Sequence, residues 1–512
     1  MPYNRLLNRV IVESFSEDFL MYIVQIASEC APVIKAGGLG DVVYGLSKEI
    51  QAQGHCAELI LPKYDCMRYD HVTDLHHAYD NLSVPWGDRI INCTVHCGWV
   101  HGLLCFFIEP HSIEDYFHRG VYYGESDDVM RFAFFSKAAL EFLLVSGKRP
   151  DVIHCHDWQT GLLPVMLYEM YAHHSMENPR ICYTIHNFKH QGVCGTEVLK
   201  ATGLNRPEYY FQYDRIRDNF NPLAINCMKA GITYSNYVNT VSPHHAWEAR
   251  HTDISCGLSH TLDTFQGKFG GILNGIDYDM WNPADDKYLP KPYSAKDFDG
   301  KLAAKKALRD RLLLADEPGK PIVAFIGRLD GQKGVPLVHH ALYYALDRGA
   351  QFVLLGSATE KAIDDEFQHE KAYLNDNPNC HLELSFNEEL SHLIYAGADI
   401  IVIPSNFEPC GLTQVIGLRY GCVPVVRGVG GLVNTVFDWD YDLEKAKGDR
   451  NGFVFYESNK AGLESALERA FDLYYQEPEL WRSLAIQGMK CDYSWKASGA
   501  MYLGVYDFIR HK

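Results

Sequence analysis

The chain has 512 residues, more than a single hydrophobic core usually serves, so two domains are expected. Charged residues make up 22% and hydrophobic residues 47%, as in globular enzymes, and no run of about 18 apolar residues occurs that could cross a membrane. The formal net charge of -18 argues against nucleic acid or an anionic membrane as a partner, so any anionic ligand must be bound by a local basic cluster.

The first 20 residues differ from the rest of the chain. They carry mixed charges and lack the apolar centre of a secretory signal, so residues 1–20 are predicted to be a disordered N-terminal extension. Elsewhere the 15 cysteines show no paired spacing, and Cys155 and Cys182 lie within predicted strands. This pattern predicts buried thiols in a reducing compartment.

A strand is predicted over residues 22–26, followed by a glycine-rich turn at 35–41 and a helix that ends at Gly54. This is the arrangement of nucleotide-binding folds, but without the glycine spacing of a dinucleotide site. In the turn, Lys35 offers a cation for a phosphate and Asp41 offers a carboxylate for hydroxyl groups. The glycines either admit a ligand to the backbone or serve only tight helix packing.

Three further predicted strands also end in polar clusters. In open parallel sheets the carboxyl ends of the strands line the ligand-binding crevice, so these clusters predict where chemistry occurs. The clusters are His156-Asp157-Trp158 after the strand at 151–154, His186-Asn187 after 181–185, and Gly327 to Gly334 after 322–326.

Three places in the sequence are candidate metal sites. His154 and His156 point the same way only if the strand continues through Cys155, and no further ligand has suitable spacing, so we predict no metal there. The segments 438–440 and 277–279 match the Asp-x-Asp signature of metal-dependent sugar transferases. Both lie in acidic, turn-rich surroundings, and we predict solvated loops.

Arg328 and Lys333 lie five residues apart on one loop flanked by glycines. Two cations at this spacing could hold a diphosphate, and solvated surface charges are the alternative. Because the loop follows a strongly apolar strand, we favour the diphosphate.

The segment 399–414 organises the second half of the chain. A buried strand at 399–403 leads through a loop into a helix, so the N–H groups of Gly411, Leu412 and Thr413 should form a helix start that suits a phosphate. Glu408 stands just before that start. A carboxylate repels phosphate but accepts hydrogen bonds from a sugar and stabilises positive charge at its anomeric carbon. A solvated loop acid is the alternative.

The first sheet is predicted to end near residue 270, where a glycine-rich segment suggests a hinge. A second α/β series follows from about 322 to 474. The chain then ends in a helix, from about 493, with Met501, Val505 and Phe508 on one face.

Six motifs occur together in one order: Lys35 to Asp41, His156 to Trp158, Thr184 to Asn187, Ile272 to Pro283, Gly327 to Gly334 and Glu408 to Gln414. With them the chain resembles bacterial glycogen synthases and plant starch synthases, which form glycosyltransferase family 5, over nearly all of residues 21–512. The segments 119–132 and 61–67 look closest to soluble starch synthases of classes III and IV.

This resemblance implies a GT-B fold, in which two Rossmann-like domains with parallel sheets face a cleft. Residues 21–270, completed by a C-terminal helix at 490–512, would bind the glucan acceptor, and residues 271–489 would bind ADP-glucose. The implied reaction is retaining transfer of glucose from ADP-glucose to the non-reducing end of an α-1,4-glucan, without a cofactor or metal.

The resemblance also implies roles for individual residues. The catalytic set would be Glu408, His186, Arg328, Lys333 and Asp157. The nucleotide-sugar set would be Lys35, Gly38, Asn274, Arg328, Lys333, Tyr395, Cys410, Gly411, Leu412 and Thr413. The acceptor set would be Asp41, Tyr123, Asp157, Trp158 and Asn187.

The expected setting is a bacterial cytoplasm, or a plastid stroma for a processed form. The chain would act as a monomer or weak homo-oligomer, with neither nucleic acid nor membrane as partner. For the retaining mechanism we favour front-face substitution, in which the leaving phosphate oxygen takes the acceptor's proton.

Two alternatives and one choice stay open. Another retaining GT-B transferase, making sucrose, trehalose or a surface glycan, often has a second Glu eight positions after the first, and Ile416 stands there. A glucan-binding scaffold with a dead site would be expected to lack Lys35, Glu408, Arg328 or Lys333, and all are present. The residues do not distinguish ADP from UDP.

Overall fold

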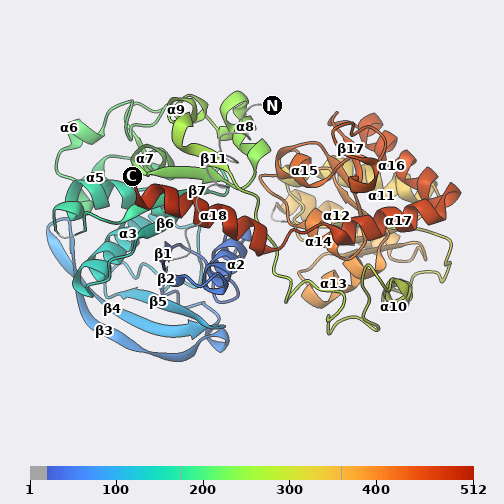
Figure 1. Ribbon diagram of the computed structural model, residues 1–512, viewed down its shortest axis with the longest axis horizontal. Coiled ribbons are helices and arrows are strands. Elements are labelled where there is room, and N and C mark those ends of the chain that lie inside the picture. The colour runs from blue at the N-terminus through green and yellow to red at the C-terminus, as the bar shows by residue number, and fades with distance from the viewer. Residues whose placement is uncertain (1–19, 175, 359) are drawn as a thin grey trace. The chain divides into compact units, whose positions relative to one another are not determined.

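The computed structural model describes residues 20–174, 176–358 and 360–512 (Figure 1). Within them the chain forms two compact units. Unit 1 runs to Gly275 and includes Trp495–Lys512, and unit 2 is Ile276–Ser494. The two boundaries between the units had been predicted after residues 270 and 489. The predicted N-terminal extension lies, apart from Leu20, outside the described residues.

Unit 1 is built on a nine-stranded sheet. Its strands, in spatial order, are β11 (Phe269–Gly271), β10 (Tyr237–Thr240), β7 (Arg180–Ile185), β6 (Val152–His156), β1 (Tyr22–Ile26), β2 (Cys56–Pro62), β5 (Leu103–Pro110), β4 (Arg89–Val100) and β3 (Thr73–Trp86). From β11 to β5 all neighbours are parallel, whereas β5, β4 and β3 form an antiparallel meander. Strands β3, β4 and β5 were not predicted from the sequence.

Helices cover the sheet of unit 1. They are α2 (Gly38–Ala52), α3 (Asp128–Val145), α4 (Leu163–Met166), α5 (Glu197–Thr202), α6 (Pro207–Tyr210), α7 (Cys227–Tyr234), α8 (Pro243–His251), α9 (Ser259–Thr264) and α18 (Trp495–Arg510), with a short hairpin of β8 (Val193–Cys194) and β9 (Ile225–Asn226). Successive residues of a strand point to opposite faces, so Ile23 packs in the cluster of α2 and α18 and Val24 in the larger core.

The last helix, α18, returns to unit 1 and crosses it beside α2 (Figure 1). A Cβ at Gly45 of α2 would overlap the ring of Trp495, so only glycine admits this contact. The buried face of α18 includes Tyr502, Val505, Tyr506 and Ile509. The predicted face was partly wrong, because Phe508 is 41% exposed.

Unit 2 has a six-stranded sheet whose neighbours are all parallel. Its strands, in spatial order, are β14 (Cys380–Glu383), β13 (Gln351–Leu355), β12 (Ile322–Ile326), β15 (Ile400–Ile403), β16 (Val423–Arg427) and β17 (Phe453–Phe455). The helices are α10 (Asp299–Leu312), α11 (Val335–Asp347), α12 (Lys361–Leu374), α13 (Glu388–Gly397), α14 (Thr413–Arg419), α15 (Gly430–Thr435), α16 (Lys460–Gln476) and α17 (Pro478–Lys490).

Two hydrophobic cores lie on the two faces of this sheet. In β12, Val323 and Phe325 join the core formed with α11 and α16, and Ile322 and Ala324 join the core formed with α10 and α13. A strand buried on both faces explains why the sequence here is a continuous apolar run, and the carboxyl ends of the strands are left for polar loops.

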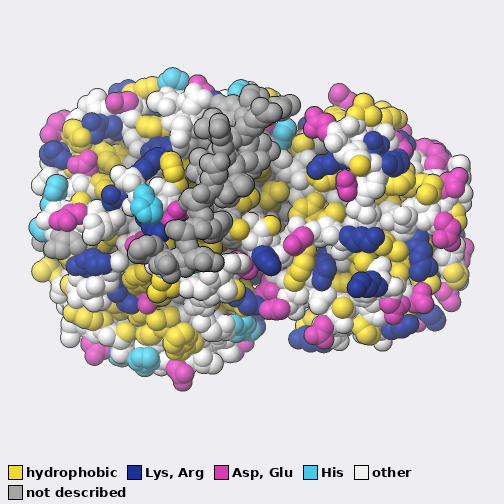
Figure 2. Space-filling model, in the orientation of Figure 1, with side chains coloured by type: hydrophobic (Ala, Val, Ile, Leu, Met, Phe, Trp, Pro, Cys, Tyr) yellow, Lys and Arg dark blue, Asp and Glu magenta, His cyan; other side chains and the backbone are white. Residues whose placement is uncertain are grey.

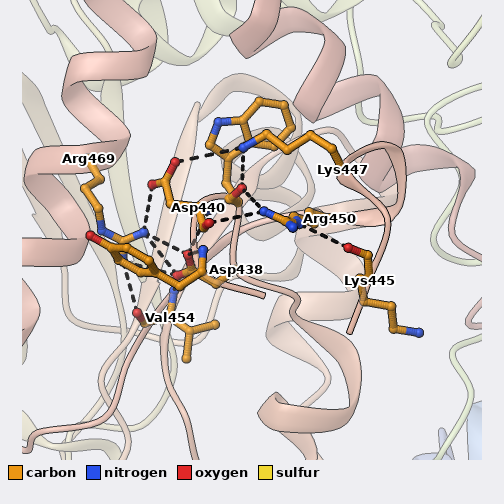
Figure 3. A network of polar contacts seen from close by, with 9 residues as sticks. Asp438, Asp440, Lys445, Lys447, Arg450, Val454 and Arg469 are labelled. Atoms are coloured by element: carbon orange, nitrogen blue, oxygen red, sulfur yellow. Dashed lines mark hydrogen bonds and ion pairs between the residues drawn. The ribbon is translucent and has the colours of Figure 1, made fainter. Parts of the chain in front are cut away.

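In the segment Asp438-Trp439-Asp440, Asp440 is exposed as predicted, but Asp438 is not the solvated loop acid that we predicted (Figure 3). Asp438 is 7% exposed and accepts hydrogen bonds from Arg469, at 2.9 Å, and from the backbone N–H of Val454, at 2.6 Å. Asp440 lies 3.0 Å from the same guanidinium. Arg469 of α16 supplies the positive charge for both carboxylates, and the buried Asp438 has a structural role.

The net negative charge is not gathered into one field on the face shown in Figure 2, where acidic and basic side chains are interspersed on both units. Within the described ranges, no helix has the length and apolar character needed to cross a membrane.

Candidate active site

The first strand of unit 1 leads into a turn that a buried carboxylate holds. Glu29, 4% exposed, accepts hydrogen bonds from the backbone N–H groups of Ala36, at 2.7 Å, and Gly37, at 2.9 Å. Its other oxygen accepts from the hydroxyl of Tyr123 at 2.7 Å. Tyr123, predicted to face the acceptor, thus also supports the turn. Sequence analysis missed Glu29, although an acid shortly after a buried strand was an available signal.

The glycines of this turn serve both of the purposes considered above. A Cβ at Gly40 would lie 3.1 Å from the carbonyl oxygen of Ile34, so Gly40 is needed for close packing. A Cβ at Gly37 or Gly38 would meet no atom within 4 Å. Open space above these two residues lets a ligand reach the backbone.

Lys35 and Asp41 flank that open space and form an ion pair of 2.8 Å. Their side chains are 43% and 34% exposed. Pairs this exposed are weak, so Lys35 can exchange the carboxylate for an anionic ligand at small cost in free energy. The structure therefore brings Lys35, Gly38 and Asp41 together.

The ends of β6 and β7 are joined through Asp157. Its Oδ1 accepts hydrogen bonds from the backbone N–H groups of His186, at 2.7 Å, and Asn187, at 3.5 Å. Asp157 itself has a left-handed backbone, with φ of 52°. Burial raises the pKa of Asp157 to about 7, against the opposing effect of these two N–H groups. Three predicted site residues are thus held in one cluster.

Trp158 begins a short 3-10 helix directly after Asp157. Its ring lies edge-on to Phe132, with centroids 5.6 Å apart, and a Cβ at Gly192 would overlap it. Trp158 is therefore partly enclosed by the protein and offers only part of its surface to an acceptor.

His154 and His156 point the same way, because β6 does continue through Cys155, and their ring centroids lie 4.2 Å apart. Both nitrogens of each ring already lie within hydrogen-bonding distance of protein groups, so neither ring has a nitrogen left for a metal. In the part of the chain that the structure describes, no group of three or more His, Cys, Asp or Glu side chains could hold a metal ion.

In unit 2 the loop after β12 is pressed against the loop after β15. Gly334 has a φ of 71°, and a Cβ there would overlap the carbonyl oxygen of Pro404, so glycine is required on both counts. Asp330 accepts hydrogen bonds from the backbone N–H groups of Gln332, at 2.9 Å, and Lys333, at 3.1 Å. These contacts aim Lys333 at the neighbouring loop.

Lys333 and Glu408 form the central contact of this loop pair. Nζ of Lys333 lies 2.6 Å from Oε2 of Glu408, and the side chains are 18% and 7% exposed. The hydroxyl of Ser405 donates to the same oxygen at 3.0 Å. Glu408 is therefore a buried, ion-paired carboxylate, and the alternative of a solvated loop acid is wrong.

Arg328, the other predicted diphosphate ligand, has a different environment. Its side chain is 57% exposed, and its guanidinium lies 3.4 Å from Asp330 and 3.3 Å from the side-chain oxygen of Gln332. Only loose contacts hold it. Of the two cations, Lys333 is half-buried in a short ion pair, and Arg328 is exposed with longer contacts.

Two glycines at the start of α15 support the Glu408 loop from behind. The N–H of Gly431 donates to the carbonyl oxygen of Glu408 at 3.0 Å. Gly430 has a φ of 48°, and a Cβ there would overlap that same oxygen. Sequence analysis missed this pair, although a Gly-x-Gly-Gly run after β16 follows the rule used for the other strand ends.

The following turn is fixed by Gln414. Its side-chain amide donates to the carbonyl oxygens of Cys410, at 3.0 Å, and Gly411, at 2.9 Å, and to Thr435 Oγ1 at 3.1 Å. Helix α14 begins at Thr413, next to Leu412, close to the predicted start.

Tyr395 belongs to the same region of unit 2, whereas Asn274 does not. Burial raises the pKa of Tyr395, and an opposing hydrogen bond links its hydroxyl to Thr413. Asn274 is in unit 1, is 8% exposed, and its Oδ1 has no hydrogen-bond partner among the described residues.

Comparisons with known proteins agree with this architecture. The family described as starch synthase catalytic domain matches residues 22–264, and the family of group 1 glycosyl transferases matches residues 310–485. The chain is similar to glycogen synthase 1 of Trichormus variabilis, with 68% identity over 96% of this chain and all of the relative. Glycogen synthase 2 of Methylococcus capsulatus is 56% identical over the same shares.

Among solved structures, the catalytic domain of starch synthase IV from Arabidopsis thaliana, bound to ADP and acarbose, is similar with a TM-score of 0.93. Its identity is 44%, over 96% of this chain and 100% of that one. Sucrose-phosphate synthase from Thermosynechococcus elongatus, at 16% identity and a TM-score of 0.58, shares the fold.

Two α/β units with parallel sheets, matched by these families, define a glycosyltransferase of the GT-B fold. Within that class, the chain belongs to the glycogen synthase and starch synthase family. The roles assigned above to single residues remain predictions.

Proposed function

We propose that this chain transfers glucose from ADP-glucose to the non-reducing end of an α-1,4-glucan, with retention at the anomeric carbon. The observation that carries the proposal is the 2.6 Å contact between Lys333 and Glu408, beside the start of α14. A sugar diphosphate needs a cation for its phosphates and a carboxylate for its sugar, and this contact joins the two. The ADP and acarbose bound to the Arabidopsis relative support this choice of ligands.

Charge explains how the donor would be activated. As the bond to the leaving ADP breaks, negative charge grows on its phosphate oxygens, and Lys333, Arg328 and the N–H groups near Leu412 stabilise it. The carboxylate of Glu408 stabilises the positive charge at the anomeric carbon. We propose that these groups make a metal or other cofactor unnecessary.

The candidate site residues of unit 1 suit a neutral ligand. His186, Asp157 and Asn187 lie at adjacent strand ends, and burial disfavours charge on the first two. Such groups favour hydroxyl hydrogen bonds over ion pairs, which fits a glucan acceptor.

We propose a front-face substitution, because Glu408 is already paired with Lys333 and Ser405 and is therefore a poor nucleophile. In this route the leaving phosphate oxygen takes the acceptor's proton. A glucosyl-enzyme adduct trapped on Glu408 in the wild-type protein with a slow donor would contradict it.

The deciding experiment incubates the full chain with labelled ADP-glucose or UDP-glucose and maltooligosaccharides, with EDTA present, and separates products by length. Extension from ADP-glucose that disappears in Glu408→Ala supports the proposal. Folded protein that binds glucan but extends it from neither donor would favour the scaffold. Extension from UDP-glucose alone would show that UDP-glucose, and not ADP-glucose, is the donor.

The proposal includes a bacterial cytoplasm as the location and a monomer or weak homo-oligomer as the active form. The bacterial origin of the similar glycogen synthases supports the first part. Sedimentation of the full chain at several concentrations tests the second, and a concentration-independent dimer would contradict it.

A further inference from the structure

A chain of buried polar groups begins at α18 and lies behind the end of β6 and β7. Its outer end is fixed by a backbone group: the side-chain amide N–H of Asn239 donates to the carbonyl oxygen of Thr240 at 3.4 Å and to the hydroxyl of Tyr502 at 3.1 Å. Since a carbonyl oxygen only accepts, this orients the amide, and Oδ1 of Asn239 must face Thr184.

That orientation propagates inward through His154. The hydroxyl of Thr184 donates to Asn239 Oδ1 at 2.9 Å, so its oxygen accepts from Nε2–H of His154 at 2.7 Å. His154 is fully buried, and burial lowers its pKa well below the usual value, so the ring is neutral and carries one proton. Its Nδ1 is therefore bare and accepts from the hydroxyl of Tyr506 at 2.8 Å.

The next group is Gln25 on β1. Gln25 is fully buried, and its side-chain nitrogen has no hydrogen-bond partner among the described residues, so the amide oxygen makes its polar contact. The amide oxygen of Gln25 then faces His156, 2.7 Å from Nε2. Because an amide oxygen only accepts, Nε2 of His156 carries the proton.

His156 passes this constraint to the predicted site residue His186. Its Nδ1 lies 3.1 Å from Nε2 of His186. Burial keeps both rings neutral, since it lowers the pKa of His156 well below the usual value and that of His186 to about 3. With Nε2 of His156 protonated, its Nδ1 accepts, and Nε2–H of His186 donates.

We propose that Gln25 and His156 are positioning residues that hold His186 in the tautomer with a bare Nδ1, so that His186 accepts a hydrogen bond and selects a ligand group able to donate one. Within the part of the chain that the structure describes, Nδ1 of His186 makes no hydrogen bond, and the side chain is only partly buried. This inference rests on the proposed function, in which His186 faces the 6-hydroxyl of the transferred glucose.

The tautomer is tested first, in the ligand-free full chain, so that this result does not depend on activity. Labelling the 24 histidines with nitrogen-15 and recording long-range proton–nitrogen correlations separates bare from protonated ring nitrogens. The His186→Gln protein assigns the His186 signals by their loss. A bare Nδ1 and protonated Nε2 are expected. A protonated Nδ1 in the wild-type protein would overturn the inference.

Two variants of Gln25 then test the positioning role. Gln25→Met removes the acceptor with little change of shape, and mixed tautomers at His186 and a drop of about tenfold in kcat/KM for the donor are expected, the size of one lost hydrogen bond. Gln25→Glu keeps an acceptor, and it should keep the wild-type tautomer. A Gln25→Met protein that folds and retains the pure tautomer would also overturn the inference. If neither variant folds, the wild-type spectrum still decides.

Donor analogues test selection. A fluorine in place of the 6-hydroxyl can accept a hydrogen bond but cannot donate one. The 6-fluoro donor should therefore bind no more tightly than the 6-deoxy donor. Tighter binding of the fluoro donor than of the deoxy donor would show that His186 donates. The predicted tautomer without any transfer by the wild-type chain would refute the proposed function alone.

Discussion

The candidate site residues of unit 1 and those of unit 2 follow different electrostatic rules. In unit 1, His186 and Asp157 are enclosed without an opposite charge, so burial pushes both toward their neutral forms. In unit 2, Glu408 is buried as well, but Lys333 lies 2.6 Å away and compensates it. Burial without a partner makes a hydroxyl-binding surface, and burial with a partner makes a charged one. The predictions below test this contrast.

The largest effect is expected from Lys333→Met. It leaves Glu408 buried without a counter-charge and removes a cation from the donor site, so unit 2 should lose about 3 kcal/mol of stability and transfer should fall about 10²–10³-fold. Urea unfolding and the transfer assay measure the two losses. Adding Glu408→Gln should restore most of the stability and none of the activity. If the double variant and Lys333→Met unfolded at the same midpoint urea concentration, the ion-pair explanation would be contradicted.

A second large effect is expected from Gly430→Ala, because the added Cβ overlaps the Glu408 carbonyl oxygen and the left-handed backbone is strained. Displacement of the loop should weaken ADP binding about tenfold and cost about 1–3 kcal/mol. Calorimetry with ADP and thermal unfolding check this. Gly448→Ala, where a Cβ meets no atom within 4 Å, is the control and should change neither.

Unit 1 should respond to pH through Asp157. Its pKa is about 7 in the folded protein and 3.8 ordinarily, so ionisation destabilises the fold above pH 7, and the loss fades as pH falls toward 3.8. Asp157→Asn keeps an acceptor and should melt higher than wild type at pH 8, by roughly 2–4 °C for each kcal/mol. The gain should vanish near pH 4.

Asp218 is the matched control in the same unit. Burial would raise its pKa, but hydrogen bonds from Asn221, Asn226 and Phe220 outweigh that effect and lower it. Ionised Asp218 therefore stabilises the fold above pH 3.8, and Asp218→Asn should melt lower than wild type at pH 8. Equal shifts of the same sign in both variants would show that burial is not the cause.

The smallest stability effect is expected from Lys35→Met, which breaks an exposed ion pair. About 0–1 kcal/mol should be lost, whereas the KM for the donor should rise if Lys35 binds its phosphate. A large loss of stability with an unchanged KM would make Lys35 a structural residue.

The site residues that were predicted most accurately from the sequence are those that directly follow a buried strand, because a continuous apolar run marks such a strand by itself. The apolar runs before Asp157, His186, Lys333 and Glu408 are buried on both faces, so their positions follow from composition and length alone. The same rule should have indicated Gly430, since it also follows a buried strand.

Other features depend on neighbours that are distant in sequence. The role of Glu29 requires Tyr123, nearly a hundred residues away. Asp438 was predicted to be a solvated loop acid because its partner Arg469 lies further along the chain, in α16. Because Phe508 is hydrophobic, it was predicted to lie on the buried face of α18. That face is instead made largely by Tyr502 and Tyr506, whose hydroxyl groups form hydrogen bonds with distant residues. Local pattern does not reveal such pairs.

The position of α18 also sets an order of events during synthesis. Unit 2 is one uninterrupted segment, Ile276–Ser494, whereas unit 1 needs residues from Trp495 onward. When the ribosome has made unit 2, Trp495 is not yet present to pack against Gly45, and the tyrosines whose hydroxyl groups contact Asn239 and His154 have not been made. The half of the protein that is made first is therefore the half that is finished last, and a nascent chain has a complete unit 2 before a complete unit 1.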